Sequence, residues 1–183
     1  MKNEYKVPVA ALLRNPGSRQ EANLEVKAPS GIGDSFYGVK EGSLVGLKAV
    51  LSSMRSGLEV KGEISATEEG KCSRCLKDIK RPVKVEFSAF MPFEKEMEED
   101  SPMPYDLDED GIYPLSGDFA DFEGLIRDEL TLQLSMVRLC KPDCKGLCPE
   151  CGADLNEVEN HSHEKQPDPR FAKLADLKER MTK

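Results

Sequence analysis

The stretch LCKPDCKGLCPECGADLNEVENHSHE, residues 139–164, places the strongest constraint on how this chain can fold. The whole chain has six cysteines and two histidines, and this segment holds four of the cysteines and both histidines. The other two cysteines, Cys72 and Cys75, form a Cys-x-x-Cys pair in KCSRCLK. Such side chains can form disulfides, take part in redox chemistry or bind metal, and each use requires a different fold around them.

Disulfide bonds and thiol redox catalysis are the less favoured interpretations. The N-terminus, MKNEYKVPVAALLRNPGS, lacks the continuous apolar segment of a secretory signal peptide. No apolar run approaches the roughly 20 residues that cross a bilayer. We therefore expect a cytoplasmic protein whose thiols stay reduced. The Cys72–Cys75 pair lies between predicted strands with no helix after it, unlike a thioredoxin-like site.

Metal binding is the interpretation that the spacing favours. Each Cys-x-x-Cys pair resembles a zinc knuckle, a tight turn that points two thiolates at one ion, and structural zinc sites take four ligands in a tetrahedron. In CPECG, Pro149 restricts the turn, and Gly152 lets the backbone fold so that its amides face sulfur. The candidate ligands are Cys72, Cys75, Cys140, Cys144, Cys148, Cys151, His161 and His163.

The sequence leaves the grouping of these ligands open. The two Cys-x-x-Cys pairs can supply one tetrahedron, with the remaining two cysteines and the two histidines forming a second. There can also be one site with spare thiols, or the four cysteines of residues 140–151 can form a site alone. Separately, the histidines can simply be solvated in a polar loop. We expect one or two zinc ions per chain.

Alternating apolar residues predict an antiparallel β-meander before this segment. A tight turn at Arg55-Ser56-Gly57 joins two of the strands, and Cys72 and Cys75 lie at the tip of the next hairpin. Residues 4–13 are predicted to form a first strand or short extended segment, and residues 29–43 a loop. The remaining predicted strands span residues 20–28, 44–54, 58–70 and 81–93.

Helical spacing predicts one helix over about residues 118–134, with Asp118 as its N-cap and Phe119, Phe122, Ile126 and Leu130 on its packed face. A C-terminal helix is predicted to begin at Asp168-Pro169. The fold class is therefore α+β. An antiparallel β-meander domain with one packed helix spans residues 1–139, and a Cys-rich zinc-knuckle tail with the terminal helix spans residues 140–183.

Charge is distributed unevenly along the 183 residues, whose net charge is −8. Residues 94–110 contain nine acids and one lysine and are predicted to form a solvated acidic loop. The balance argues against a nucleic-acid-binding protein held by bulk positive charge. One basic patch exists nevertheless, and it consists of Lys71, Arg74, Lys77, Lys80, Arg81 and Lys84.

No catalytic motif is present. The chain has no G-x-S-x-G, no P-loop, no G-x-G-x-x-G opening a helix and no H-E-x-x-H, and both histidines lie beside the cysteines. We therefore expect a protein that is not an enzyme and takes no small-molecule substrate.

The combined pattern resembles the YceD family, over roughly residues 45–180. The resemblance is carried by CSRCL after a hairpin, an acidic loop, a helix ending in DELTLQL, then KGLCPECGADLN and DPRFAKLADL. It implies a cytoplasmic, non-enzymatic factor that supports accumulation of 23S ribosomal RNA and so biogenesis of the large ribosomal subunit. Relatives usually carry Cys-x-Cys where this chain has His161-Ser162-His163, and imidazole in place of thiolate retains a zinc ligand.

Two modes of action are compatible with this function. In the first, the basic patch contacts phosphates of ribosomal RNA or of a large-subunit precursor. Because aromatic residues make up only 6% of the chain and no Trp occurs, such contact should be electrostatic and salt-sensitive. In the alternative, the protein is a zinc-binding protein–protein adaptor without direct RNA contact, and the acidic segment 94–110 docks a basic partner such as a ribosomal protein.

Overall fold

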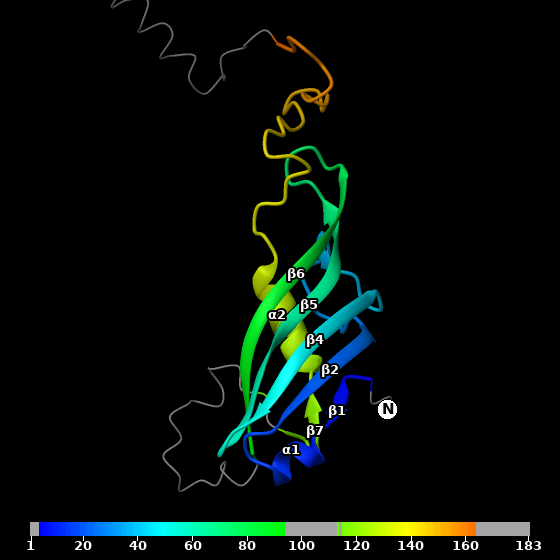
Figure 1. Cartoon of the computed structure of the whole chain (residues 1–183). Coiled ribbons are helices and arrows are strands. Elements are labelled where there is room, and N and C mark those ends of the chain that lie inside the picture. Colours follow the sequence, from blue (N-terminus) through cyan, green and yellow to red (C-terminus); the bar gives the residue numbers. More distant parts are fainter. Residues whose placement is uncertain (1–3, 94–112, 114, 164–183) are drawn as a thin grey trace, which may run out of the picture.

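The structure is a computed structural model that describes residues 4–93, 113 and 115–163 (Figure 1). Antiparallel strands are the main secondary structure of the described chain, and two helices accompany them. The elements in chain order are β1 (Lys6–Pro8), α1 (Ala10–Arg14), β2 (Arg19–Lys27), β3 (Tyr37–Val39), β4 (Leu44–Ser53), β5 (Gly57–Lys71), β6 (Asp78–Pro92), β7 (Phe119–Asp121) and α2 (Glu123–Gln133).

The main sheet has five strands in the order β2-β4-β5-β3, and β6 pairs with the other edge of β5. Strands β5 and β6 are 15 residues each and pair over their full length, from Gly57 opposite Pro92 to Lys71 opposite Asp78. Strand β4 covers the first part of β5, and the short β3 covers its last residues. The β5–β6 hairpin therefore extends past β2 and β4 and carries Cys72 and Cys75 at its tip (Figure 1).

The core lies between one face of this sheet and α2 (Figure 1). Alternate residues of β5, among them Leu58, Val60 and Ile64, are fully buried, and Ile126 and Leu130 of α2 pack in the same cluster. This matches the period-two pattern that predicted the strand. At one end of the fold, β1 and β7 form a separate antiparallel pair.

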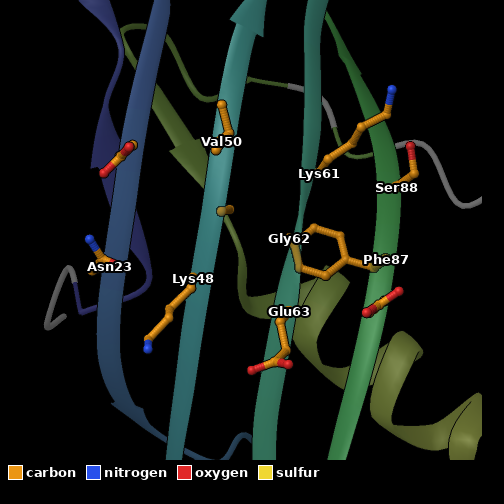
Figure 2. Close-up of a pocket in the computed structure, with 11 residues that line it drawn as sticks. Asn23, Lys48, Val50, Lys61, Gly62, Glu63, Phe87 and Ser88 are labelled. Carbon is orange, nitrogen blue, oxygen red and sulfur yellow. The ribbon is translucent and has the colours of Figure 1, made fainter.

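Gly62 marks a point where neighbouring strands approach closely. A Cβ atom there would lie 2.2 Å from the carbonyl oxygen of Lys48, so no larger residue fits. Its cross-strand partner is Phe87, whose ring lies beside the glycine (Figure 2). An aromatic ring beside a strand glycine restores packing that the missing side chain leaves out.

The predicted strands over residues 20–28, 44–54, 58–70 and 81–93 are confirmed. Residues 4–13 differ, because only Lys6–Pro8 is a strand and α1 follows it. The predicted loop over 29–43 contains β3. The acidic segment 94–110 and the terminal helix from Asp168 lie outside the described residues.

The helix predicted from residue 118 begins five residues later, at Glu123. Residues 119–121 instead pair with β1 as β7, and the backbone N–H of Val9 donates to the carbonyl of Asp118 over 2.8 Å. Phe119 is consequently a partly exposed strand residue, whereas Phe122, Ile126 and Leu130 are buried as predicted. Long-range strand pairing thus overrides the helical spacing at its first position. Among the described residues, neither helix is long and apolar enough to cross a membrane.

Candidate metal centre

Four cysteine sulfurs converge where the β5–β6 hairpin meets the segment after α2. Cys72 and Cys75 come from the hairpin tip, Cys140 and Cys144 come from the later segment, and all four sulfurs lie within 4.8 Å of one another. The Sγ atoms of Cys72 and Cys144 are 3.8 Å apart. A tetrahedral zinc ion with Zn–S bonds of about 2.3 Å places its sulfurs about 3.8 Å apart. The first cluster therefore fits a zinc ion in both ligand chemistry and spacing.

A second cluster joins Cys148 and Cys151 to His161 and His163, again with all ligand atoms within 4.8 Å. Each histidine Nε2 lies 3.3 Å from a cysteine Sγ, that of His163 from Cys148 and that of His161 from Cys151. Sulfur and imidazole nitrogen around zinc are about 3.6 Å apart, given bonds of about 2.3 and 2.0–2.1 Å. This cluster fits zinc as well, and it is more exposed than the first.

The two Cys-x-x-Cys turns share one backbone geometry. In the first, the N–H of Leu76 donates to the carbonyl of Cys72 over 3.0 Å, and Leu76 has a φ of 60°. In the second, Gly152 donates to Cys148 over 2.9 Å with a φ of 74°. Glycine adopts this left-handed region at little cost, whereas leucine does so with strain. The glycine of CPECG therefore serves the turn, and Leu76 takes the same conformation without that freedom.

The thiols of the first cluster are electrostatically unequal. Burial raises the pKa of Cys72, but backbone N–H donors at Cys75, Arg74 and Cys140 outweigh it and bring the pKa to about 6. The hydrogen bond to Cys75, together with burial, raises the pKa of Cys140 to about 12. Several thiolates this close repel one another, so without a cation they cannot all ionise near neutral pH. A divalent ion removes that conflict.

Backbone donors act in the second cluster too. The N–H groups of Cys151 and Glu150 lower the pKa of Cys148 to about 6. A carboxylate oxygen of Glu150 lies 3.3 Å from Nδ1 of His163, whose Nε2 faces the cluster. A carboxylate on the outer nitrogen of a ligating imidazole fixes the ring's orientation. The second cluster thus has four candidate ligands, and the Glu150 carboxylate orients one of them, His163.

All eight predicted ligands are brought together, but in a grouping that the sequence analysis did not consider. The two Cys-x-x-Cys pairs do not meet, and the tail cysteines do not form one site. Instead, the hairpin pair joins Cys140 and Cys144, and the tail pair joins the two histidines. Disulfides are absent from the described residues, where all six cysteines are free.

A set of buried polar contacts beneath the first cluster was not predicted from the sequence. Tyr37 of β3 is buried beside Cys72 and Cys144, and its hydroxyl donates to the buried carboxylate of Glu68. The guanidinium of Arg138 lies 5.0 Å from the centre of the Tyr37 ring. The carbonyl of Arg138 also accepts a 2.8 Å hydrogen bond from the N–H of Ser73 in the knuckle. These contacts fix the knuckle to the sheet.

The basic patch is largely neutralised. Lys80 pairs with Glu69, Lys84 with Glu63, and Arg81 Nε lies 2.8 Å from Glu68. The other pairs are Lys71 with Asp78, and Lys77 with both Asp154 and Glu157. Arg74 is engaged differently, because its Nη1 donates to the carbonyl of Cys144 over 2.8 Å. Of the six predicted RNA-contact residues, four therefore pair within the hairpin, whereas Arg74 and Lys77 bind the later segment.

A shallow hollow lies on the sheet across β2, β4, β5 and β6 (Figure 2). Its labelled residues carry both signs of charge, among them Lys48, Lys61 and Glu63. None of the cysteines or histidines of the two clusters lines it. The clustered Cys and His side chains of the described chain therefore lie at the hairpin tip and in the segment after α2, away from this hollow.

Comparison with known proteins identifies a family whose match includes both clusters. A family model described as "Large ribosomal RNA subunit accumulation protein YceD" matches residues 60–178, which include both clusters. An uncharacterized protein of Mycobacterium tuberculosis is 33% identical over 171 residues, covering 93% of this chain and 80% of that protein.

More distant relatives include a Zea mays protein named large ribosomal RNA subunit accumulation protein YCED homolog 1, chloroplastic. It is 37% identical over 57 residues, or 31% of this chain and 20% of its own length. A Bacillus subtilis protein, YlbN, is 25% identical over 107 residues, 58% of each chain. No solved structure gives a significant match. Since the family model covers well over half of the chain, and a relative more than 30% identical spans almost all of it, the chain belongs to the YceD family.

Proposed function

We propose that this protein supports accumulation of the RNA of the large ribosomal subunit as a zinc-stabilised factor without catalytic activity of its own. The family description and the names of the plant relatives support the biological role. The observation that carries the molecular part is the arrangement of eight Cys and His side chains in two four-membered sets.

Two features of these sets support a structural role for the metal. Catalytic zinc sites keep a position open for water or substrate, whereas structural sites are closed by four protein ligands. Each set here offers four. Residues 140–163 also contain no helix or strand longer than an isolated bridge, so metal binding would supply folding energy that this segment's own packing does not.

The ion pairs of the hairpin favour a protein partner over RNA. Five of the six basic side chains already face carboxylates, and Arg74 is bound to a backbone carbonyl. To contact phosphate, each would have to give up or share its partner. The adaptor mode therefore receives specific support from the structure, and direct RNA contact through this patch is the second candidate.

Elemental analysis of protein purified without added metal or chelator tests the metal. We expect about two zinc ions per chain; less than about 0.2 per chain with reduced thiols would refute it. The biological role is tested by sedimenting cell extracts and locating the protein relative to large-subunit precursors. Loss of the gene should lower the level of large-subunit RNA, and an unchanged level would refute the role.

RNA affinity measured at several salt concentrations separates the two modes. The variant replaces Lys71, Lys80 and Lys84 by Gln, because these three exposed side chains touch neither cluster. The matched control replaces Lys27, Lys48 and Lys61, on the sheet away from the tip. Direct contact predicts that the salt slope falls by up to about 0.9 per lost phosphate contact in the first variant only. If the two variants bind RNA with equal affinity, and both still capture a ribosomal protein, the adaptor mode would be established.

A further inference from the structure

Asn156 links the two clusters. It lies on the loop between the ligands of the second cluster, yet its Nδ2 is 3.5 Å from Sγ of Cys144, a fully buried member of the first. Its Oδ1 accepts a 2.9 Å hydrogen bond from the backbone N–H of Lys145. Because that N–H can only donate, the amide oxygen must face Lys145, and the NH₂ group must therefore face the sulfur.

The same loop holds Asn156 in place from its other side. Asp154 Oδ1 accepts hydrogen bonds from Asn156 Nδ2 over 2.7 Å and from the Asn156 backbone N–H over 2.9 Å. The other carboxylate oxygen of Asp154 lies 2.9 Å from Nζ of Lys77 in the first knuckle. A further backbone hydrogen bond, from Leu155 to Gly146, spans 2.9 Å. The loop of the second cluster is thus fitted against the ligands of the first.

We infer that Asn156 is a positioning residue of the first cluster and that, through it, the two clusters bind metal with positive coupling. This inference rests on the metal binding proposed above. Four thiolates around a divalent ion carry excess negative charge, and an N–H donor to one sulfur offsets part of it and fixes its direction. Closing the second cluster on a metal orders the loop that carries this donor. By linkage, metal in the first cluster must strengthen binding in the second by the same factor.

The scarcity of apolar packing around the loop makes the coupling substantial. Residues 152–163 contain no helix or strand, and Val158 is exposed while Leu155 is only partly buried. Such a segment has little apolar packing to order it, so the metal supplies the order. When the second cluster is empty, only the polar contacts described above hold the loop, and we expect Asn156 to leave Cys144.

Cobalt(II) binding to the full chain tests the inference, because sulfur-to-cobalt absorbance reports the thiolates directly. Asn156→Ala removes the donor, and Glu159→Ala, an exposed position on the same loop, is the matched control. His161→Ala with His163→Ala disables the second cluster. We expect the first cluster's cobalt affinity to fall about tenfold in Asn156→Ala and in the histidine variant, as for other outer-sphere changes, with the control unchanged. Circular dichroism verifies that the sheet persists.

The decisive measurement is the triple variant. If the histidines act through Asn156, adding Asn156→Ala to the histidine variant produces little further loss, because the donor is already displaced. Full additivity, or a change below about threefold in Asn156→Ala alone, overturns the coupling while wild-type protein still binds two ions. Wild-type protein that binds neither cobalt nor zinc overturns the metal proposal itself and the coupling with it. The two failures are thus distinguishable.

Discussion

Removing one hydroxyl beneath the first cluster should destabilise the whole fold. Tyr37 is 1% exposed, and its hydroxyl donates to Glu68, which is 3% exposed. Tyr37→Phe keeps the ring that packs beside Cys72 and Cys144 but removes the donor. The carboxylate then retains Arg81 Nε, at 2.8 Å, as its hydrogen-bond partner from this network.

The size of the effect follows from the charge on the acceptor. A hydrogen bond to a charged group contributes about 1.5–3 kcal/mol, and the loss is larger where the acceptor cannot reach water. Because Arg81 remains, we expect the lower part of that range, about 1.5–2 kcal/mol. For a protein of this size, each kcal/mol shifts the melting temperature by roughly 2–4 °C, so the expected drop is about 3–8 °C.

The assay is reversible denaturant and thermal unfolding of zinc-saturated protein at one fixed zinc concentration, since ligand concentration alters apparent stability. Tyr5→Phe is the matched control, because the Tyr5 hydroxyl donates to the carbonyl of Lys27 in an exposed setting, 2.7 Å away. That variant should lose less than about 0.5 kcal/mol. If Tyr37→Phe loses no more unfolding free energy than Tyr5→Phe, Glu68 is not a desolvated acceptor and the reasoning fails.

The pH dependence of stability provides a second check on the contact between Tyr37 and Glu68. Burial, followed by the hydrogen bond to Glu68, raises the pKa of Tyr37 above that of a free phenol. A group whose folded pKa is raised contributes fully below its unfolded pKa, near 10 for tyrosine, and loses that contribution as pH rises through the folded value. The stability difference between wild type and Tyr37→Phe should therefore be constant from about pH 7 to 9 and shrink only at higher pH.

Three further predictions concern the knuckles and their connection. Leu76→Gly should stabilise the zinc-loaded protein by up to about 1 kcal/mol, since Leu76 is exposed and strained at positive φ, whereas Gly152→Ala should destabilise it. If unfolding measurements show that both variants change stability in the same direction, the shared turn geometry is contradicted. Cys148→Ser should lower the zinc content from about two ions to one and increase proteolysis within residues 148–163 while residues 140–147 stay protected; loss of both ions would show that the sites are not separate. Lys77→Met, which removes the pairs with Asp154 and Glu157, should speed proteolysis of the same loop, and an unchanged digestion rate would mean that the pairs contribute nothing.

The fold was predictable where a local pattern determined it. The long strands follow from period-two alternation, and alternate residues of β5 are buried as that pattern requires. The errors fall where a distant segment decides the outcome. Residues 119–121 have helical spacing, but pairing with β1 makes them a strand. Likewise β3, only three residues long, exists because β5 offers it an edge. Such short strands have no signature in their own sequence.

For the candidate site, the eight candidate ligands could be chosen from the sequence, whereas their grouping into two clusters could not. Cysteine and histidine chemistry marks all eight residues without any structure. Which four side chains form one cluster depends on where the hairpin tip lies relative to the segment that leaves α2. Arg138, at that exit, binds Ser73 of the knuckle through its carbonyl and Asp34 through its guanidinium, at 2.7 Å. This attachment brings Cys140 and Cys144 to the first knuckle and leaves the histidines for the second.

The basic patch shows that some tertiary information was already contained in the predicted hairpin. Once the turn around Cys72 is assigned, antiparallel register places Glu69 opposite Lys80 and Glu68 opposite Arg81. Side chains facing each other across two strands are about 5 Å apart, close enough for opposite charges to pair. Counting charges along residues 71–84 alone omits these acids of β5 and so overstates the positive charge of the surface. In the adaptor mode proposed above, a partner at this hairpin would face groups of both signs, which a mixed-charge protein surface matches better than a uniformly anionic phosphate backbone.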